Sequence, residues 1–220
     1  MDFALDRGID RRDGWHDRTM VERTLPDPVA DALAAWLEAH DRVAPGVVEG
    51  LYVVGSVALA DWQPHSDIDI VAFTADPTDA ATVAALEAAH AGYHDQAGRP
   101  TVDGPFLSWA DVGSPPLAAQ RAWSLDGEFR FDGECFEINP VTWHTLAEHG
   151  VAVRGPAPEL LDIYVDASDR RTWVRENLDT YWRNARDEIV DALAQAPDRR
   201  EFRSGTVEWC VLGVARMWFT

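Results

Sequence analysis

One stretch, residues 51–73, limits what the chain can fold into more than any other part of it. Leu51–Val54 is a short apolar run that predicts a buried strand, and Gly55-Ser56 ends this run and can open a helix. A second strand-like run follows, and it carries Asp67 and Asp69. Because residues two apart in a strand point to the same face, these two carboxylates are expected to project side by side.

The chemistry of these residue types points to a nucleotide. Two adjacent carboxylates repel each other unless a cation lies between them, and hard divalent ions such as Mg²⁺ prefer oxygen ligands of this kind. Gly55 lets the backbone approach a ligand closely, and the amides at a helix start favour a phosphate. The pattern therefore predicts a metal-dependent nucleotide site. The alternative is an ordinary strand edge with two solvated aspartates after a turn, which would explain an Asp-x-Asp pattern alone.

A known family shows the same combination. Gly55-Ser56 followed by Ser66–Ile70 resembles the signature of the polymerase-β-like nucleotidyltransferases. In that family a Gly-Ser turn holds the triphosphate, and two aspartates with a third carboxylate on a neighbouring strand hold two Mg²⁺ ions. With ATP as co-substrate, the resemblance implies metal ligands at Asp67 and Asp69 and nucleotide-binding residues at Gly55, Ser56 and Ser66.

The third carboxylate is predicted on the run Val102–Trp109, which can form another strand. Asp103 stands near its start, and the resemblance implies that it completes the metal site and takes the proton from an attacking hydroxyl, as a general base must. The alternative is a turn aspartate, because Asp-Gly-Pro is ordinary turn chemistry. Asp111, just after the strand, is the weaker competitor for the same role.

The second half of the chain resembles the branch of this family that adenylylates streptomycin and spectinomycin. The resemblance rests on Trp143–Leu146, on Val153–Pro156 and on Leu212–Trp218. In those enzymes a nucleotidyltransferase domain and a helical domain close over ATP and drug, and AMP passes to a drug hydroxyl. The chain departs from the branch because it stops where the family continues into a further helical segment that includes a lysine.

Three further site residues are implied by that resemblance alone. Arg216 matches an arginine that contacts the ATP phosphates, Trp182 an aromatic residue against which the antibiotic rests, and Asp187 an acidic residue that pairs with its cationic groups. The alternatives are an exposed helix arginine for Arg216, core packing for Trp182 and a solvated helix charge for Asp187.

The charge of the chain bears on its partners. A formal net charge of −19 disfavours a nucleic-acid partner, which needs a basic face, and suits a cationic acceptor. An acidic surface kept for solubility explains the same number. The chain contains no lysine, so no lysine can hold a phosphate here. It has no run of 18 apolar residues and no signal-peptide pattern at its start, which predicts a cytoplasmic protein without a membrane partner.

The expected organisation has three parts: an N-terminal arm over 1–27, a nucleotidyltransferase domain over 28–157, and a helical domain over 158–220 that is either incomplete or ends in a docked helix. The fold class is α/β (α+β), a mixed twisted sheet with flanking helices followed by an all-α C-terminal domain. Two details are also expected. The run 129–139 forms a strand pair turning at Asp132-Gly133, in which Glu134 and Glu137 could approach the site but are expected on a solvated face. His90 on the helix 79–90 faces solvent.

The sequence thus predicts a Mg²⁺-dependent enzyme that transfers AMP from ATP to a hydroxyl of an aminoglycoside-like small molecule. Two alternatives remain open. One is a nucleotidyltransferase that modifies a protein or RNA acceptor, for example an AMP transferase of the antitoxin type. The other is a non-catalytic nucleotide-binding module that keeps the fold.

Overall fold

The computed structural model describes residues 24–94, 100–116, 120–195 and 204–219. Most of the predicted N-terminal arm, up to residue 23, lies outside the described residues, and the first helix begins at Asp27. Within the described ranges, no helix is both long enough and apolar enough to span a membrane.

The centre of the molecule is one sheet with six strands in the order β5-β4-β3-β2-β1-β6. β2 and β3 pair in parallel, and every other neighbouring pair is antiparallel, which confirms the expected mixed sheet. The strands are β1 (Gly50–Val53), β2 (Ile68–Phe73), β3 (Val102–Leu107), β4 (Trp123–Leu125), β5 (Glu128–Arg130) and β6 (Val151–Arg154).

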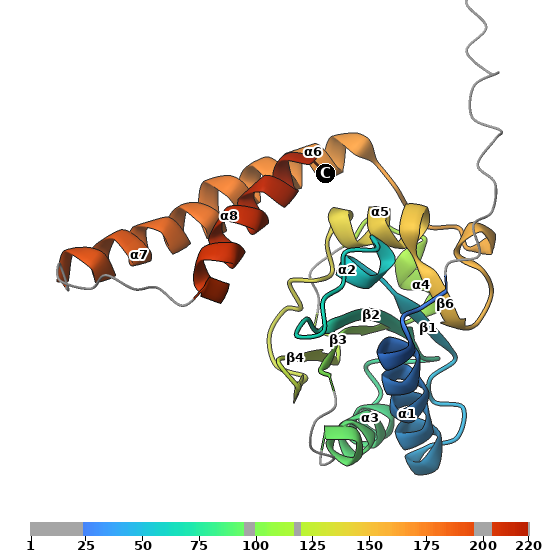
Figure 1. The fold of residues 1–220 in the computed structure, drawn as a ribbon. Helices are drawn as coiled ribbons and strands as arrows, with labels where there is room; N and C mark the ends of the chain where they lie inside the picture. Colours follow the sequence, from blue (N-terminus) through green and yellow to red (C-terminus); the bar gives the residue numbers. More distant parts are fainter. Residues whose placement is uncertain (1–23, 95–99, 117–119, 196–203, 220) are drawn as a thin grey trace, which may run out of the picture.

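Helices cover both faces of this sheet. Figure 1 shows α1 and α3 on one face and α2, α4 and α5 on the other, while α6, α7 and α8 extend to one side. The helices are α1 (Asp27–Val43), α2 (Gly55–Ala58), α3 (Ala80–His94), α4 (Trp109–Val112), α5 (Pro140–His149), α6 (Ala167–Asn177), α7 (Arg183–Gln195) and α8 (Ser204–Phe219), with a 3-10 turn η1 (Pro158–Leu160) and a π-helical turn η2 (Leu178–Trp182).

Two apolar clusters, one on each face of the sheet, explain why the sequences of the central strands are continuously apolar. Leu51 packs in the cluster that contains Trp36 of α1, whereas its neighbour Tyr52 packs in the cluster that contains Trp143 of α5. Successive strand residues point to opposite faces, so a strand covered by helices on both sides needs apolar residues at every position. These four side chains are at most 1% exposed.

The hairpin prediction was wrong in its position. β5 ends at Arg130, and the turn lies at Asp126-Gly127, where both residues have positive φ angles of 53° and 77°. A two-residue hairpin turn of this type needs positive φ at both positions, which an Asp-Gly pair adopts readily. The chain offers two Asp-Gly dipeptides in this region, and the pattern alone favoured the second.

The prediction for His90 was also wrong. The side chain is only 3% exposed, and its Nε2 atom lies 2.9 Å from the carbonyl oxygen of Gly127. Burial lowers the pKa of His90. The helix pattern could not show this contact, because it forms only once α3 packs beneath the β4–β5 hairpin.

The long helix predicted for residues 169–195 forms as α6, η2 and α7, with one π-helical turn in the middle. α8 packs against this turn through Trp182, whose ring centroid lies 4.7 Å from that of Trp209. Gly213 of α8 lies under the same ring: a Cβ atom added there would sit 2.1 Å from Cη2 of Trp182. The glycine thus permits close contact between α8 and η2. The domain boundary after residue 157 stays a prediction.

Replacing Gly213 by alanine is expected to lower the free energy of unfolding by about 1–3 kcal/mol, because the added methyl group overpacks this contact. Gly92→Ala is the matched control, since it is also a helical glycine but has nothing within 4 Å of the added Cβ. There alanine should stabilise by roughly 0.5–1 kcal/mol through its higher helix propensity. Urea denaturation followed by tryptophan fluorescence measures both. An equal stabilisation by both substitutions would contradict the contact.

Candidate active site

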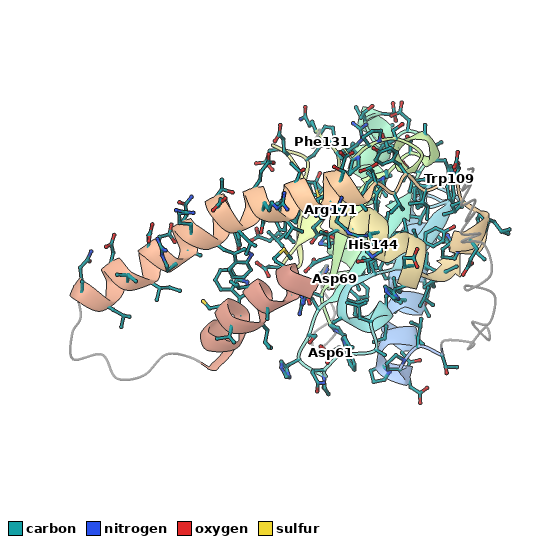
Figure 2. All side chains as sticks on the ribbon, turned by 90° about the horizontal axis from the view of Figure 1, so that it is seen from above. Asp61, Asp69, Trp109, Phe131, His144 and Arg171 are labelled. Atoms are coloured by element: carbon teal, nitrogen blue, oxygen red, sulfur yellow. The ribbon has the colours of Figure 1, made fainter. Side chains whose placement is uncertain are left out.

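The parallel pair β2 and β3 brings two of the predicted carboxylates level with each other. Asp69 and Asp103 are register partners on adjacent strands. Asp103 is 1% exposed, Asp69 is half-buried, and Asp67, just before β2, is exposed. Ser66 is half-buried in the turn that leads into the same strand. The three aspartates therefore lie at one end of the two strands, where Figure 2 labels Asp69 close to the end of α8.

The Gly-Ser turn lies in close contact with the side chain of Asp69. Gly55 has a positive φ of 58°, and a Cβ atom placed on it would lie 1.7 Å from Oδ2 of Asp69. The backbone N–H of Ser56 donates a hydrogen bond to the same carboxylate. On the main chain, the N–H of Val54 donates to the carbonyl oxygen of Asp69 at 2.9 Å. Only glycine allows this approach, so the turn and the carboxylate are positioned as one unit.

The carboxylate of Asp69 is costly to ionise in this place. Burial and then the negative charge of Asp67 raise its pKa to about 6, against the opposing effects of the hydrogen bond from Ser56 and the positive charge of Arg216. Burial likewise raises the pKa of Asp103. Buried carboxylates that repel one another favour the binding of a cation, because the cation stabilises their charged forms.

Asp103 is held by the hairpin that the sequence analysis misplaced. The backbone N–H of Asp126 donates to its Oδ2 atom at 2.9 Å, and that of Gly127 donates to its Oδ1 atom at 3.2 Å. Each oxygen keeps a further lone pair. The alternative residue, Asp111, instead caps α4 by accepting from Ser108 and pairs with Arg121 at 2.9 Å. Asp103, rather than Asp111, is thus the carboxylate that lies level with Asp69 on the neighbouring strand.

The donor chemistry of this site fits a hard divalent cation at the carboxylate pair. Within the described ranges, however, no three acidic, histidine or cysteine side chains are already arranged around one point as metal ligands. Asp67 is exposed and the oxygens of Asp103 face the hairpin amides, so a three-carboxylate set requires rotation of these side chains. Asp67 and Asp69 are therefore the residues that could hold a metal first.

A cavity of about 390 Å³ opens beside Asp69. Its lining joins the Gly-Ser turn, the strand β2, the helix α5 and the end of α8, through residues that include Gly55, Asp69, His144 and Arg216. Nearby, the hydroxyl of Ser56 is buried without a hydrogen-bond partner among the described residues. A buried hydroxyl normally finds a partner, so the site fits a ligand with acceptor oxygens, such as a phosphate.

One carboxylate near the site, Glu137, was expected on a solvated strand face rather than among the site residues. Glu137 lines the same cavity, and its pKa is raised well above the usual range, first by burial and then by the charges of Asp69, Asp103 and Asp67. The sequence analysis placed residues 129–139 in a strand pair, which turned Glu137 toward solvent. The segment instead leads into α5, whose N-cap is Asn139. No local pattern indicates this return to the site.

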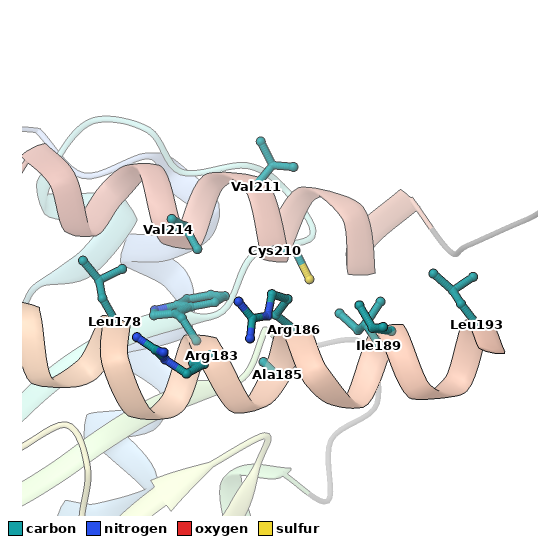
Figure 3. A pocket seen from close by; sticks show the side chains of 11 residues that line it. Leu178, Arg183, Ala185, Arg186, Ile189, Leu193, Cys210, Val211 and Val214 are labelled. Atoms are coloured by element: carbon teal, nitrogen blue, oxygen red, sulfur yellow. The ribbon is translucent and has the colours of Figure 1, made fainter. Parts of the chain in front are cut away.

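The two residues predicted to hold the acceptor lie elsewhere. Trp182 lines a separate apolar cavity of about 600 Å³ between α7 and α8, which Figure 3 shows, and it packs on Gly213. Asp187 pairs with Arg186, with Oδ1 2.8 Å from Nε. The structure does not bring either residue into the cavity of Asp69, and their acceptor-binding role stays a prediction.

Comparisons with known proteins agree with this geometry. Residues 37–104 match the family model described as nucleotidyltransferase domain. Among solved structures, the spectinomycin adenyltransferase AAD(9) from Enterococcus faecialis, in a structure with ATP and spectinomycin, is similar with a TM-score of 0.52 and 10% identity over 86% of this chain and 87% of that one. No curated protein matches the chain significantly.

Two toxin–antitoxin structures are also similar, at lower scores. One, with AMP-PNP, gives a TM-score of 0.33 and 16% identity over 75% of this chain and 98% of that one. The other, a mutant of the toxin–antitoxin MntA-HpeT, gives 0.31 and 14% over 72% and 95%. Scores this low support no argument about the fold. The first structure supports the same fold for this chain, and the similarity to the family described as nucleotidyltransferase domain lies in residues 37–104.

Proposed function

We propose that the protein transfers AMP from ATP to a hydroxyl of a cationic, aminoglycoside-like molecule and releases pyrophosphate. The observation that carries the proposal is that Gly55, Asp69 and Arg216 line one cavity although they come from three separate parts of the chain. The acceptor class is taken from the neighbouring structure, which holds ATP and spectinomycin.

The nucleotide is held at the Gly-Ser turn. The buried hydroxyl of Ser56 and the backbone around Gly55 face the triphosphate, with Ser66 beside the strand that follows. Arg216, which already acts electrostatically on Asp69, supplies a permanent positive charge and forked donors for the phosphates.

Asp67 and Asp69 hold the divalent cation, for which we propose Mg²⁺, and Asp103 completes a second site. Bound there, the metal neutralises charge on the transferred phosphoryl group. The raised pKa of Asp69 supports this assignment, because a nearby cation would stabilise the ionised carboxylate, which burial and Asp67 destabilise.

Asp103 is the general base. The two hairpin amides fix its orientation, and burial raises its pKa, which makes it a better proton acceptor than a solvated aspartate. It takes the proton of the acceptor hydroxyl while the acceptor oxygen bonds to the α-phosphorus. The bond from that phosphorus to the bridging oxygen breaks, and pyrophosphate leaves with the electron pair.

The charge around the cavity supports a cationic acceptor. The pKa of Glu137 is raised well above its usual range by burial and by the charges of the three aspartates, so a positive group that enters the cavity would be favoured there. Trp182 and Asp187 are proposed to contact the acceptor from the helical part, residues 158–220, and the nucleotidyltransferase domain is proposed to span residues 28–157.

The test is pyrophosphate release from MgATP in the presence of spectinomycin, streptomycin or a neutral disaccharide, with mass spectrometry of the product. We expect release and an adenylylated product with a cationic drug only. Asp67→Ala should abolish both, whereas Asp61→Ala, an exposed acid on the same loop, should not. MgATP binding without any drug-dependent release would count against the acceptor class and favour a protein acceptor or a non-catalytic module.

A further inference from the structure

Two basic side chains meet where α5 packs against α6, at the edge of the cavity that holds Asp69. His144 of α5 lines this cavity. Arg170 lies in the first turns of α6, and Figure 2 shows this part of α6, marked by Arg171, beside His144. Burial lowers the pKa of His144, and the positive charge of Arg170 lowers it further, so the two groups act on each other directly.

Both side chains carry a buried polar atom that lacks a partner. Nδ1 of His144 and Nε of Arg170 are buried and, among the residues that the structure describes, have no hydrogen-bond partner. An unsatisfied buried polar group costs about 1–3 kcal/mol, and native structures rarely leave one without a reason. Two such atoms on neighbouring side chains, one of which lines the cavity of Asp69, fit a ligand with acceptor oxygens.

Arg170 is half-buried and forms no ion pair among the described residues, whereas Arg171 and Arg175, which also form none there, are exposed. The chain has 38 acidic and 19 basic residues, so most arginines can find a carboxylate. The arginines that do form ion pairs in the described ranges are Arg42, Arg121, Arg130, Arg154, Arg183 and Arg186.

We propose that His144 and Arg170 form an anion subsite that binds the outer phosphates of the nucleotide, the part that leaves as pyrophosphate. The subsite rests on the proposed function. α5 packs against α2, and one cavity joins the Gly-Ser turn of α2 to His144, so a phosphate chain held at Gly55 can extend toward the α5–α6 junction. The guanidinium offers a planar fork of donors, and a neutral imidazole donates one N–H. Because the chain contains no lysine, these two side chains would bind the phosphates in place of a lysine ammonium group.

Isothermal titration with pyrophosphate alone, MgATP and AMP tests the subsite. Arg170→Met is expected to raise the Kd for pyrophosphate and for MgATP roughly ten- to a hundredfold, as loss of a charge-assisted hydrogen bond does. The Kd for AMP, which lacks the outer phosphates, should change little. His144→Ala should weaken the same two ligands. Arg175→Met is the matched control, since it removes an exposed arginine from the same helix.

The outcomes separate the subsite from the proposed function. Unchanged affinity of Arg170→Met for pyrophosphate and MgATP would overturn the subsite, even if AMP transfer proceeds. Pyrophosphate binding that depends on Arg170, in a protein that adenylylates no acceptor, would support the subsite and count against the proposed function. A wild-type protein that binds neither pyrophosphate nor MgATP would overturn both. Arg170→Lys, with partial affinity and an unchanged melting temperature, would show that charge rather than packing is lost.

Discussion

Asp69→Asn is expected to reduce pyrophosphate release by on the order of a thousandfold, because it removes a charge from the proposed metal site. The same change is expected to stabilise the metal-free protein at pH 8. Burial raises the pKa of Asp69 from 3.8 to about 6, so ionisation opposes folding. The contribution of the protonated form to stability is complete below pH 3.8 and is lost as the pH rises through about 6.

The size of this effect follows from the two pKa values. Their difference corresponds to up to about 3 kcal/mol at pH 8, and partial exposure of the side chain reduces that figure. Urea denaturation in EDTA at pH 4 and pH 8 measures it, and the gain should be absent at pH 4. Added Mg²⁺ should stabilise the wild type but not Asp69→Asn. Asp61→Asn, on an exposed side chain nearby, is the control and should change neither property. A variant that is less stable than wild type at pH 8 would contradict the account.

Gly55→Ala is expected to abolish activity and to destabilise the fold by more than left-handed backbone strain alone. The added Cβ would lie 1.7 Å from Oδ2 of Asp69, so the carboxylate or the turn must move. The strain of a non-glycine residue at positive φ costs about 1–2 kcal/mol by itself. The collision adds to this cost and displaces the residue on which the proposed metal site depends.

Gly46→Ala measures the cost of backbone strain at positive φ without any collision. Gly46 has a φ of +80° and nothing within 4 Å of an added Cβ, so this variant carries the strain without the collision. It should lose about 1 kcal/mol of unfolding free energy and keep its activity. Urea denaturation and pyrophosphate release compare the two variants. If Gly55→Ala matched Gly46→Ala in both measurements, the turn would not position Asp69.

The sequence predicted those parts of the fold that local patterns determine. The apolar run before Gly55 could only be a strand covered on both faces, and β2 follows from the alternation around Asp69. The position of Asp103 beside Asp69 was expected from the resemblance to the family alone, and the parallel pairing of β2 with β3 does place the two residues level with each other. The roles assigned to these residues stay predictions.

The sequence could not predict contacts that form only between distant segments. His90 is buried because the turn at Asp126-Gly127 lies above it, and that turn was misplaced by one Asp-Gly dipeptide. The same error turned Glu137 toward solvent, although it faces the carboxylates. In both cases the local pattern was ambiguous, and packing against a segment far along the chain decided the outcome.

If the nucleotide binds as proposed, the close packing of α8 on the π-helical turn η2 couples nucleotide affinity to helix docking. Arg216 reaches the cavity from the end of α8, so the fraction of molecules in which α8 is docked multiplies the intrinsic affinity for the nucleotide. Because linkage is reciprocal, the nucleotide should in turn strengthen the docking of α8. Under the proposed function, a substitution that loosens the contact between Gly213 and Trp182 is therefore expected to raise the apparent Kd for ATP, although neither residue needs to touch the nucleotide.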